Sequence, residues 1–360
     1  MSVIFTQESP YYRGRPQNLL ARAAAGECMT DLSMKSDLRH SERLGRRIRT
    51  GDARSLGVPT EDLALAALVD GDHDSAREYF DYSVEEKARV RAIFDTWLDA
   101  LLAYGRDEIP GFEAEVERLT DLIGIPPPTD AATLGRADTE RALAALERGD
   151  RAEFEAALRD QREAALTLHD AQADWAWGLL SSLRDGLGEE RMDEVFRVTQ
   201  GNWVSERYAA LGEMTSQESL ELTIEGMRGH FTGPARAGRV GVAEEDDRWI
   251  LSFDPCGSGG RMRRSDPDRA QTPRTEAPFS FAVTEEAHDW SWGRKGVCLY
   301  CAHCAVVNEI MPIERLGAPM RMTENPENPD DQCRWTIYKS PELVPDWVYE
   351  RVGKQPPTRT

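Results

Sequence analysis

Apolar residues recur at intervals of three and four over two long stretches, 60–123 and 131–222, in which glycine and proline are sparse. One example is the series Val90, Ile93, Phe94, Trp97, Leu98, Leu101 and Leu102. This spacing puts apolar side chains on one face of a helix that packs on a core. The run Gly-Ile-Pro-Pro-Pro at 124–128 interrupts the pattern, so we expect it to separate two helical regions.

The two helical regions match each other when the sequence is shifted from position 64 to position 142. Residues 64–72 (ALAALVDGD) then align with 142–150 (ALAALERGD), and Trp97 aligns with Trp175. In each copy we expect glycine to end one helix in a left-handed conformation and the following aspartate to cap the next helix. The match predicts a duplicated helical hairpin. Chance similarity between two Ala- and Leu-rich helices is the alternative.

The second copy carries polar residues that the first lacks, because His169-Asp170 stands where the first has Arg91-Ala92. Asp170 and Asp174 lie one helical turn apart, so their like charges repel and need compensation if this face is buried. The face is either a solvated acidic surface, or His169 and Asp170 contribute to a substrate pocket that faces the cysteine-rich part of the chain.

The pattern changes after a helix expected over 216–230, where glycines become frequent and apolar runs become short. Strands are predicted at 239–242, 248–253, 320–323 and 334–338, with a weak alternation at 279–283. A short helix is expected to begin inside 298–304 and to continue through Glu309. The fold class is therefore α+β: an N-terminal all-α region of duplicated helical hairpins and a small C-terminal antiparallel α+β module with a cysteine-rich metal site.

These changes of pattern divide the chain into four regions. We expect helical regions at 1–125 and 130–232, a cysteine-rich metal-binding module at 233–345, and a tail at 346–360. A chain of 360 residues is long for a single core, which agrees with more than one domain.

The charge of the chain narrows the range of partners. A formal net charge of -20 disfavours nucleic acid and anionic membranes as partners. The basic stretch 35–54 is the exception, and is either a surface paired with the acidic remainder or an anion-binding arm. No signal peptide and no membrane-spanning run of about 18 apolar residues is visible, so we expect a cytoplasmic protein. A small-molecule substrate is the expected partner, and a homo-oligomer is left open.

Five of the six cysteines lie in the last 105 residues, three of them in the run Cys-Leu-Tyr-Cys-Ala-His-Cys at 298–304. Without a secretory signal, clustered cysteines are typical of metal ligands rather than disulfides. The best set of four is Cys256, Cys301, Cys304 and Cys333, which predicts tetrahedral zinc. The sheet and the cysteine helix would bring them together at one sheet edge. An iron–sulfur cluster is the alternative cofactor.

The surplus of polar groups around this cluster suggests chemistry as well as structure. Cys298 and His303 exceed what a closed zinc site needs, and Glu309 follows them, so these three are candidates for proton transfer or nucleophilic chemistry. The turn of Gly257, Ser258 and Gly259 lets backbone amides approach a ligand, and Arg261 could hold a carboxylate. The alternative is that this glycine turn serves only to shape the backbone at a metal site. His230 and His288 could also reach the site, although such histidines are more often surface residues.

The order of these motifs resembles the family of L-2-amino-thiazoline-4-carboxylic acid hydrolase-like proteins. The residues that carry the resemblance are His169-Asp170, Cys256, Cys301, Cys304 and the run 333–338 (CRWTIY), over about 142–339. The resemblance implies an α/β domain with a cysteine-lined site and hydrolysis of a small heterocyclic or amide-like C–N bond. Cys298, the Gly-Ser-Gly-Gly turn and the N-terminal duplicate depart from the family pattern.

Together these observations predict a metal-thiolate protein that hydrolyses a C–N bond in a small molecule. In this hypothesis the metal polarises a carbonyl or activates water, Glu309 or His303 moves protons, and Arg261 with the glycine turn holds an anionic group. A zinc-stabilised binding or regulatory module without catalysis is the second hypothesis. An iron–sulfur redox protein is the third.

Overall fold

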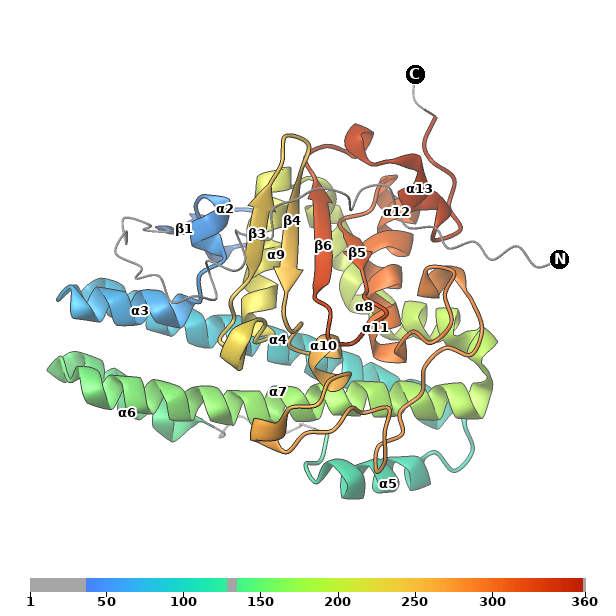
Figure 1. Cartoon of the computed structure of the whole chain (residues 1–360), viewed down its shortest axis with the longest axis horizontal. Helices are drawn as coiled ribbons and strands as arrows, with labels where there is room; N and C mark the ends of the chain where they lie inside the picture. The colour runs from blue at the N-terminus through green and yellow to red at the C-terminus, as the bar shows by residue number, and fades with distance from the viewer. Residues whose placement is uncertain (1–36, 128–134, 359–360) are drawn as a thin grey trace. The chain divides into compact units, whose positions relative to one another are not determined.

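Two long helices, α4 (His73–Glu108) and α7 (Arg151–Leu187), form the centre of the helical region and pack against each other (Figure 1). Each is preceded by a shorter helix that packs along it, α3 (Thr60–Val69) before α4 and α6 (Arg136–Arg148) before α7. The computed structural model describes residues 37–127 and 135–358. Predictions for residues 1–36 fall outside these ranges.

The predicted Gly-Asp turns of the two hairpins are confirmed. Gly71 has a φ of 77° and Gly149 a φ of 66°, both in the left-handed region that glycine adopts without strain. The side chain of Asp72 then accepts a hydrogen bond from the amide of Ser75, and that of Asp150 accepts from the amide of Glu153. The same two residues therefore end one helix and cap the next in both copies.

The two hairpins share one apolar core, which explains why the matching positions are apolar. Phe80 of α4 and Phe154 of α7 are both fully buried and meet edge to face, with ring centroids 5.5 Å apart. Further along, Trp97 and Trp175 lie in the main core of the molecule together with Trp177. Three more helices complete the helical region: α5 (Glu113–Ile123), α8 (Met192–Gly212) and α9 (Ser216–Gly229).

A small antiparallel sheet follows, as predicted, with the order β3-β4-β6-β5. Its strands are β3 (Gly241–Glu244), β4 (Arg248–Phe253), β5 (Met322–Glu324) and β6 (Cys333–Tyr338). Trp249, Leu251 and Phe253 alternate toward the interior along β4 and pack with residues of α9, which lies behind the sheet in Figure 1. The molecule is thus a mixed helix-and-sheet fold with one small antiparallel sheet.

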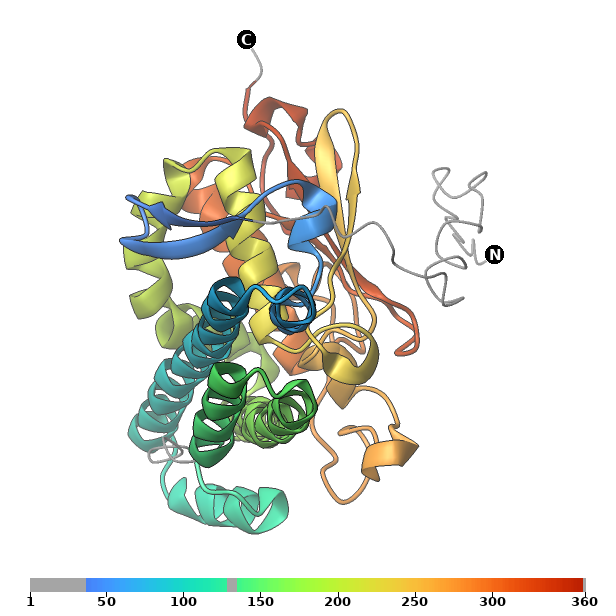
Figure 2. The same ribbon diagram turned by 90° about the vertical axis from the view of Figure 1, so that its left-hand side faces the viewer.

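The cysteine run begins a helix that changes its geometry. Helix α11 (Leu299–Ala305) continues through a π-helical segment (Val306–Ile310) into α12 (Met311–Leu316). This confirms the helix expected through Glu309. In Figure 2 these segments lie between the sheet and the long helices. The remaining helices are short: α2 (Ala53–Leu56), α10 (Gly259–Met262) and α13 (Asp346–Glu350).

Two local expectations differ from the structure. Residues 279–283 form no strand, since Val283 makes only an isolated bridge to Cys298. The N-terminal region expected to be helical contains a hairpin of two strands, β1 (Asp37–Ser41) and β2 (Arg46–Thr50). The two strands consist mostly of polar residues with few apolar ones, so their sequence shows no clear two-residue period that would predict a strand.

The basic stretch is a surface paired with acidic residues, which was one of its two interpretations. Arg46 donates two hydrogen bonds to the buried carboxylate of Glu225, at 2.8 and 2.6 Å, and Arg43 pairs with Glu213 at 2.7 Å. Residues Ser36–Thr360 form one compact unit, so the hairpin, the helices and the sheet pack together. None of the helices in the described ranges is long and apolar enough to cross a bilayer.

Candidate functional site

The four cysteines predicted to bind a metal all line one cavity of about 60 Å³. Cys333 opens β6 and pairs across the sheet with Phe253, the last residue of β4, and Cys256 follows three residues later. Cys301 and Cys304 come from α11. The predicted meeting of strand ends and cysteine helix is therefore present. The cavity is much smaller than the roughly 150 Å³ that holds a benzene ring, so it suits an ion, water or a small reacting group.

The glycine turn brings three chain segments together at this cavity. A Cβ on Gly257 would lie 1.6 Å from the carbonyl oxygen of His230, and a Cβ on Gly259 would lie 2.5 Å from the sulfur of Cys301. Any larger residue would push the turn away from α9 or from α11. These two glycines therefore serve the packing of the protein itself, while Ser258 and Gly259 also line the cavity.

The sulfurs share a cavity but not a coordination shell. Among the residues that the structure describes, no group of three or more His, Cys, Asp or Glu is arranged to hold a metal ion. Zinc coordination would need Zn–S distances of about 2.3 Å from several sulfurs at once. The thiols would therefore have to turn toward a common centre on binding. The metal site remains a prediction.

The electrostatics of the thiols differ within the cavity. A hydrogen bond from the Cys298 thiol outweighs burial and, with Arg263, lowers the pKa of Cys301 to about 7. Burial, and then the neighbouring sulfurs, raise the pKa of Cys304 and of Cys333 well above the usual value. Several thiolates at this site would thus repel one another. A cation at their centre would remove that repulsion.

A half-buried cation without an acidic partner lies near Cys304. Arg321 donates to Asn308 Oδ1 at 2.9 Å and to Thr223 Oγ1 at 2.8 Å, and it stacks over the Trp335 ring at 4.5 Å. In the described part of the chain no carboxylate forms an ion pair with it. Burial lowers the pKa of Arg321 to about 10, and Cys304 and then Tyr208 act in the opposite direction.

Two histidines line the same cavity. His303 Nδ1 donates to the carbonyl oxygen of Tyr300, so its Nε2 is free to face the Cys304 sulfur at 3.7 Å. Burial lowers the pKa of His303 to about 4, so the ring is neutral. His230 follows α9 and is also neutral, because burial and then the neighbouring His169 and His303 lower its pKa. Sequence reasoning treated His230 as a surface residue, which is wrong.

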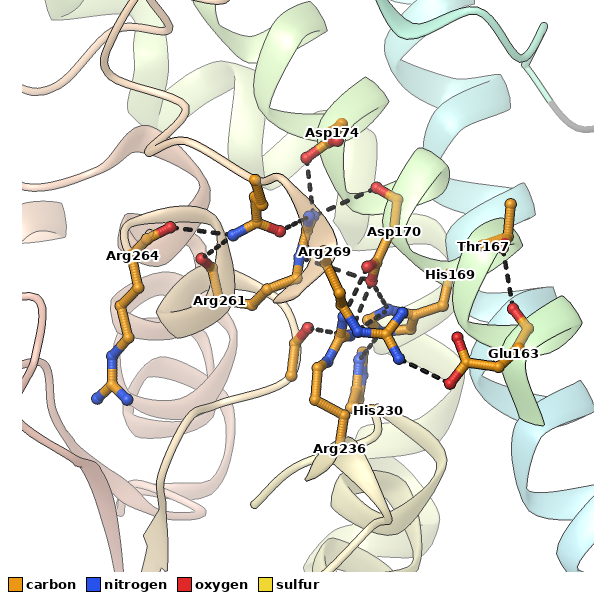
Figure 3. Close-up of polar contacts among 12 residues, drawn as sticks. Glu163, Thr167, His169, Asp170, Asp174, His230, Arg236, Arg261, Arg264 and Arg269 are labelled. Atoms are coloured by element: carbon orange, nitrogen blue, oxygen red, sulfur yellow. Dashed lines mark hydrogen bonds and ion pairs between the residues drawn. The ribbon is translucent and has the colours of Figure 1, made fainter. Parts of the chain in front are cut away.

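His169 and Asp170 do not line the cavity but contact the residues behind its wall (Figure 3). Asp170 is held by Arg236 at 2.6 and 2.7 Å and by His169 Nδ1 at 3.1 Å. Burial alone would raise the pKa of Asp170, but Arg261, His169 and Arg236 hold it well below its usual range. These two residues reach the cavity lining through His230, whose Nδ1 lies 3.2 Å from His169 Nε2, and Arg236 links Asp170 to the carbonyl of Gly257.

The compensation expected for the acidic helix face is provided by arginines from the cysteine-rich part of the chain. Asp174 is bound by Arg261 at 2.7 Å and by Arg274 at 2.8 Å. Arg261 also donates to Gln271 and is 3% exposed. It is absent from the cavity lining, so the structure does not support Arg261 as a substrate-holding residue. Its guanidinium joins α10 to α7 instead.

Two other candidates lie outside the cavity lining as well. Glu309 is fully buried and accepts from Arg351 at 2.6 Å, from Trp292 Nε1 at 3.0 Å and from the amide of Thr323 at 3.0 Å. Its oxygens are engaged by structural donors, so it does not reach the thiols as an acid or base. Cys298 caps α11 by accepting from the Cys301 amide. It supports Cys301 rather than facing the cavity.

The residues that sequence reasoning missed are Arg263 and Arg321, and it gave His230 too little weight. Arg263 lines the cavity, and its Nη2 donates to the carbonyls of Pro326 and Glu327. Pro326 and Pro329, in the loop before Cys333, also form part of the cavity wall.

Comparisons with known proteins found no match to a family model, to a curated protein or to a solved structure. The resemblance to hydrolase-like proteins is thus untested and remains a prediction from the motifs above.

Proposed function

We propose that this protein is a hydrolase of small molecules whose centre is a soft-metal site formed by Cys256, Cys301, Cys304 and Cys333. The observation that carries the proposal is that four thiols, from three separate segments, line one cavity small enough for an ion. Thiolates are the ligands that zinc prefers in protein sites of this composition.

Charge around the cavity supports a thiolate-bound ion. Four thiolates with one Zn²⁺ carry a net charge of about -2 in the tetrahedral sites that cysteines form. Arg321 has no carboxylate partner in the described ranges, and Arg263 lines the cavity. These two half-buried guanidinium groups would offset that charge.

The bond cleaved in this proposal is a C–N bond of an amide-like group or a small heterocycle. Water adds to the carbon, the C–N bond breaks, and the proton lost by the water passes to the departing nitrogen. A zinc ion held by all four thiolates has no open coordination position, so it would polarise the carbon–oxygen group or activate the water only when one thiolate leaves it. The cavity admits only the reacting group, and an anionic substituent outside it would face Arg263 rather than Arg261.

Turnover with and without metal tests this function. The full chain is incubated with 2-amino-thiazoline-4-carboxylate and with a panel of small amides, and loss of substrate is followed by liquid chromatography. We expect turnover by the zinc-loaded protein and at least a tenfold loss after chelation, restored by added zinc. Cys333→Ser should behave like the chelated protein. Equal turnover before and after chelation would refute the metal centre.

A second function is favoured by one contact, that of the Cys304 sulfur with His303 Nε2. A thiol beside a neutral imidazole can act as a nucleophile without any metal. This hydrolase would be insensitive to chelation and would be stopped by iodoacetamide, with the label on Cys304. The zinc-bound form should instead be protected from that reagent. A colourless protein with zinc but no turnover would favour a non-catalytic zinc module, and a brown one an iron–sulfur protein.

A further inference from the structure

Three polar side chains lead from the ion-pair cluster to the wall of the cavity, and the direction of each hydrogen bond can be assigned (Figure 3). Asp170 Oδ1 lies 3.1 Å from His169 Nδ1, and His169 Nε2 lies 3.2 Å from His230 Nδ1. An ionised carboxylate can only accept, so His169 Nδ1 carries the hydrogen. A neutral His169 then has its lone pair on Nε2. His230 Nδ1 must therefore donate to it.

A neighbouring arginine does not reverse this assignment. Arg236 Nη2 lies 3.4 Å from His169 Nδ1, which would matter if it donated there. Its two hydrogens are already directed to Asp170 Oδ1 at 2.7 Å and to the carbonyl of Gly257 at 2.8 Å. Both contacts are shorter than the one to His169. The arginine thus leaves His169 Nδ1 to Asp170 and keeps that carboxylate ionised.

The consequence for His230 is a fixed lone pair on Nε2. Since Nδ1 points to His169, Nε2 points away from His169, and His230 is one of the residues that line the cavity. His230 is half-buried. Phe94 and His169 both pack edge to face against the ring, with centroids 5.5 and 5.4 Å away, so it cannot turn freely.

We propose that His230 is the proton acceptor of the cavity and that His169 and Asp170 are positioning residues that hold its lone pair there. Only the identity of the reaction rests on the hydrolysis proposed above. As the water oxygen bonds to the substrate carbon, Nε2 takes one water proton and the C=O pair moves onto oxygen. When the C–N bond breaks, that proton passes to the nitrogen, so one water is consumed and an acid and an amine form.

The test is the tautomer of His230 in the full chain, read by NMR of ¹⁵N-histidine-labelled protein and assigned with a His230→Gln variant. We expect hydrogen on Nδ1 and none on Nε2. His169→Phe keeps the aromatic packing but removes the acceptor, so the two ¹⁵N signals should move toward each other. His169→Gln restores a carbonyl acceptor and should restore the wild-type signals. His288→Gln is the control, since His288 pairs with Glu189 away from the cavity.

Each contrary result has a distinct meaning. Hydrogen on Nε2 in the wild type, or unchanged signals in His169→Phe, would overturn the proposal. If the ¹⁵N signal of His230 Nε2 shifts only when zinc is added, His230 is a metal ligand, and this result would also overturn the proposal. A protein that binds no zinc but keeps this tautomer would contradict the metal centre alone, so the two failures are distinguishable.

Discussion

Two buried polar clusters lie on either side of His230, and they differ in whether their charges are matched. Behind the cavity wall, Asp170 and Asp174 are paired with Arg236, Arg261 and Arg274. In the cavity itself, four thiols line one wall or another without converging on a common centre, and Arg321 has no carboxylate partner among the described residues. In the matched cluster each buried charge is offset by a partner of opposite charge, so no ligand is needed to explain the burial of these residues. The cavity cluster has no such pairing. We therefore expect a ligand there and place function in the cavity.

The largest expected effect breaks the matched cluster. Asp174→Ala leaves Arg261 and Arg274 without their shared carboxylate, and removing one partner of a buried pair costs about 3–5 kcal/mol. Urea denaturation of the full chain measures the change in free energy of unfolding. Asp138→Ala is the matched control, because Asp138 pairs with the largely exposed Arg141. Its cost should stay within about 1 kcal/mol.

The second effect concerns the unmatched cluster. A bound ion stabilises the fold by about 3 kcal/mol when its free concentration is roughly 100 times its Kd. Chelation should therefore lower the free energy of unfolding by about that amount, and zinc should restore it. In Cys333→Ser the chelator should have no such effect. An identical response of variant and wild type would show that the ion is bound elsewhere.

The third effect is acid sensitivity of the matched cluster. Burial lowers the pKa of His169, and this effect is larger than the opposite effect of its hydrogen bond to Asp170. As the pH falls below about 6.5, His169 is therefore protonated in the unfolded chain before it is protonated in the folded protein, which lowers the free energy of unfolding. The pKa of Asp170 is also lowered, which adds a second loss below about pH 4. Stability should thus fall as the pH drops through both values. His169→Gln should reduce the first loss and keep the second in urea titrations at stepped pH, because His230 and His303 also have lowered pKa values and contribute the rest of the first loss.

The smallest effect separates Cys298 from the cavity thiols. Serine is a good N-cap and can also donate to Cys301, but position 298 is buried in the apolar core, so Cys298→Ser should lower the free energy of unfolding by about 1 kcal/mol. Zinc content should be unchanged. Loss of zinc in this variant would place Cys298 among the ligands.

Local sequence pattern was enough to predict part of this comparison. The convergence of Cys256, Cys301, Cys304 and Cys333 follows from strand ends and a helix start meeting at one edge, and the structure brings all four to one cavity. The need to compensate Asp170 and Asp174 was also visible, because like charges one turn apart repel. The two Gly-Asp turns depend only on neighbouring residues.

Partners far apart in the chain could not be predicted. Arg261 meets Asp174 across 87 positions, and Arg351 meets Glu309 across 42. Arg261 and Glu309 were candidate site residues, but in these ion pairs they have a structural role. His230 was ranked as a surface histidine for the same reason, since its neighbour His169 is 61 positions away. No periodicity encodes such contacts, which arise only when the helices and the sheet pack.

The most direct test is X-ray absorption at the zinc edge on the purified, zinc-loaded full chain. Our account predicts one zinc per chain with four sulfur neighbours at about 2.3 Å. In Cys301→Ser the sulfur count should fall to three, or the zinc should be lost. A zinc ion surrounded by oxygen and nitrogen, or a protein that retains no zinc while all four thiols stay reduced, would contradict the claim that these thiols bind one ion.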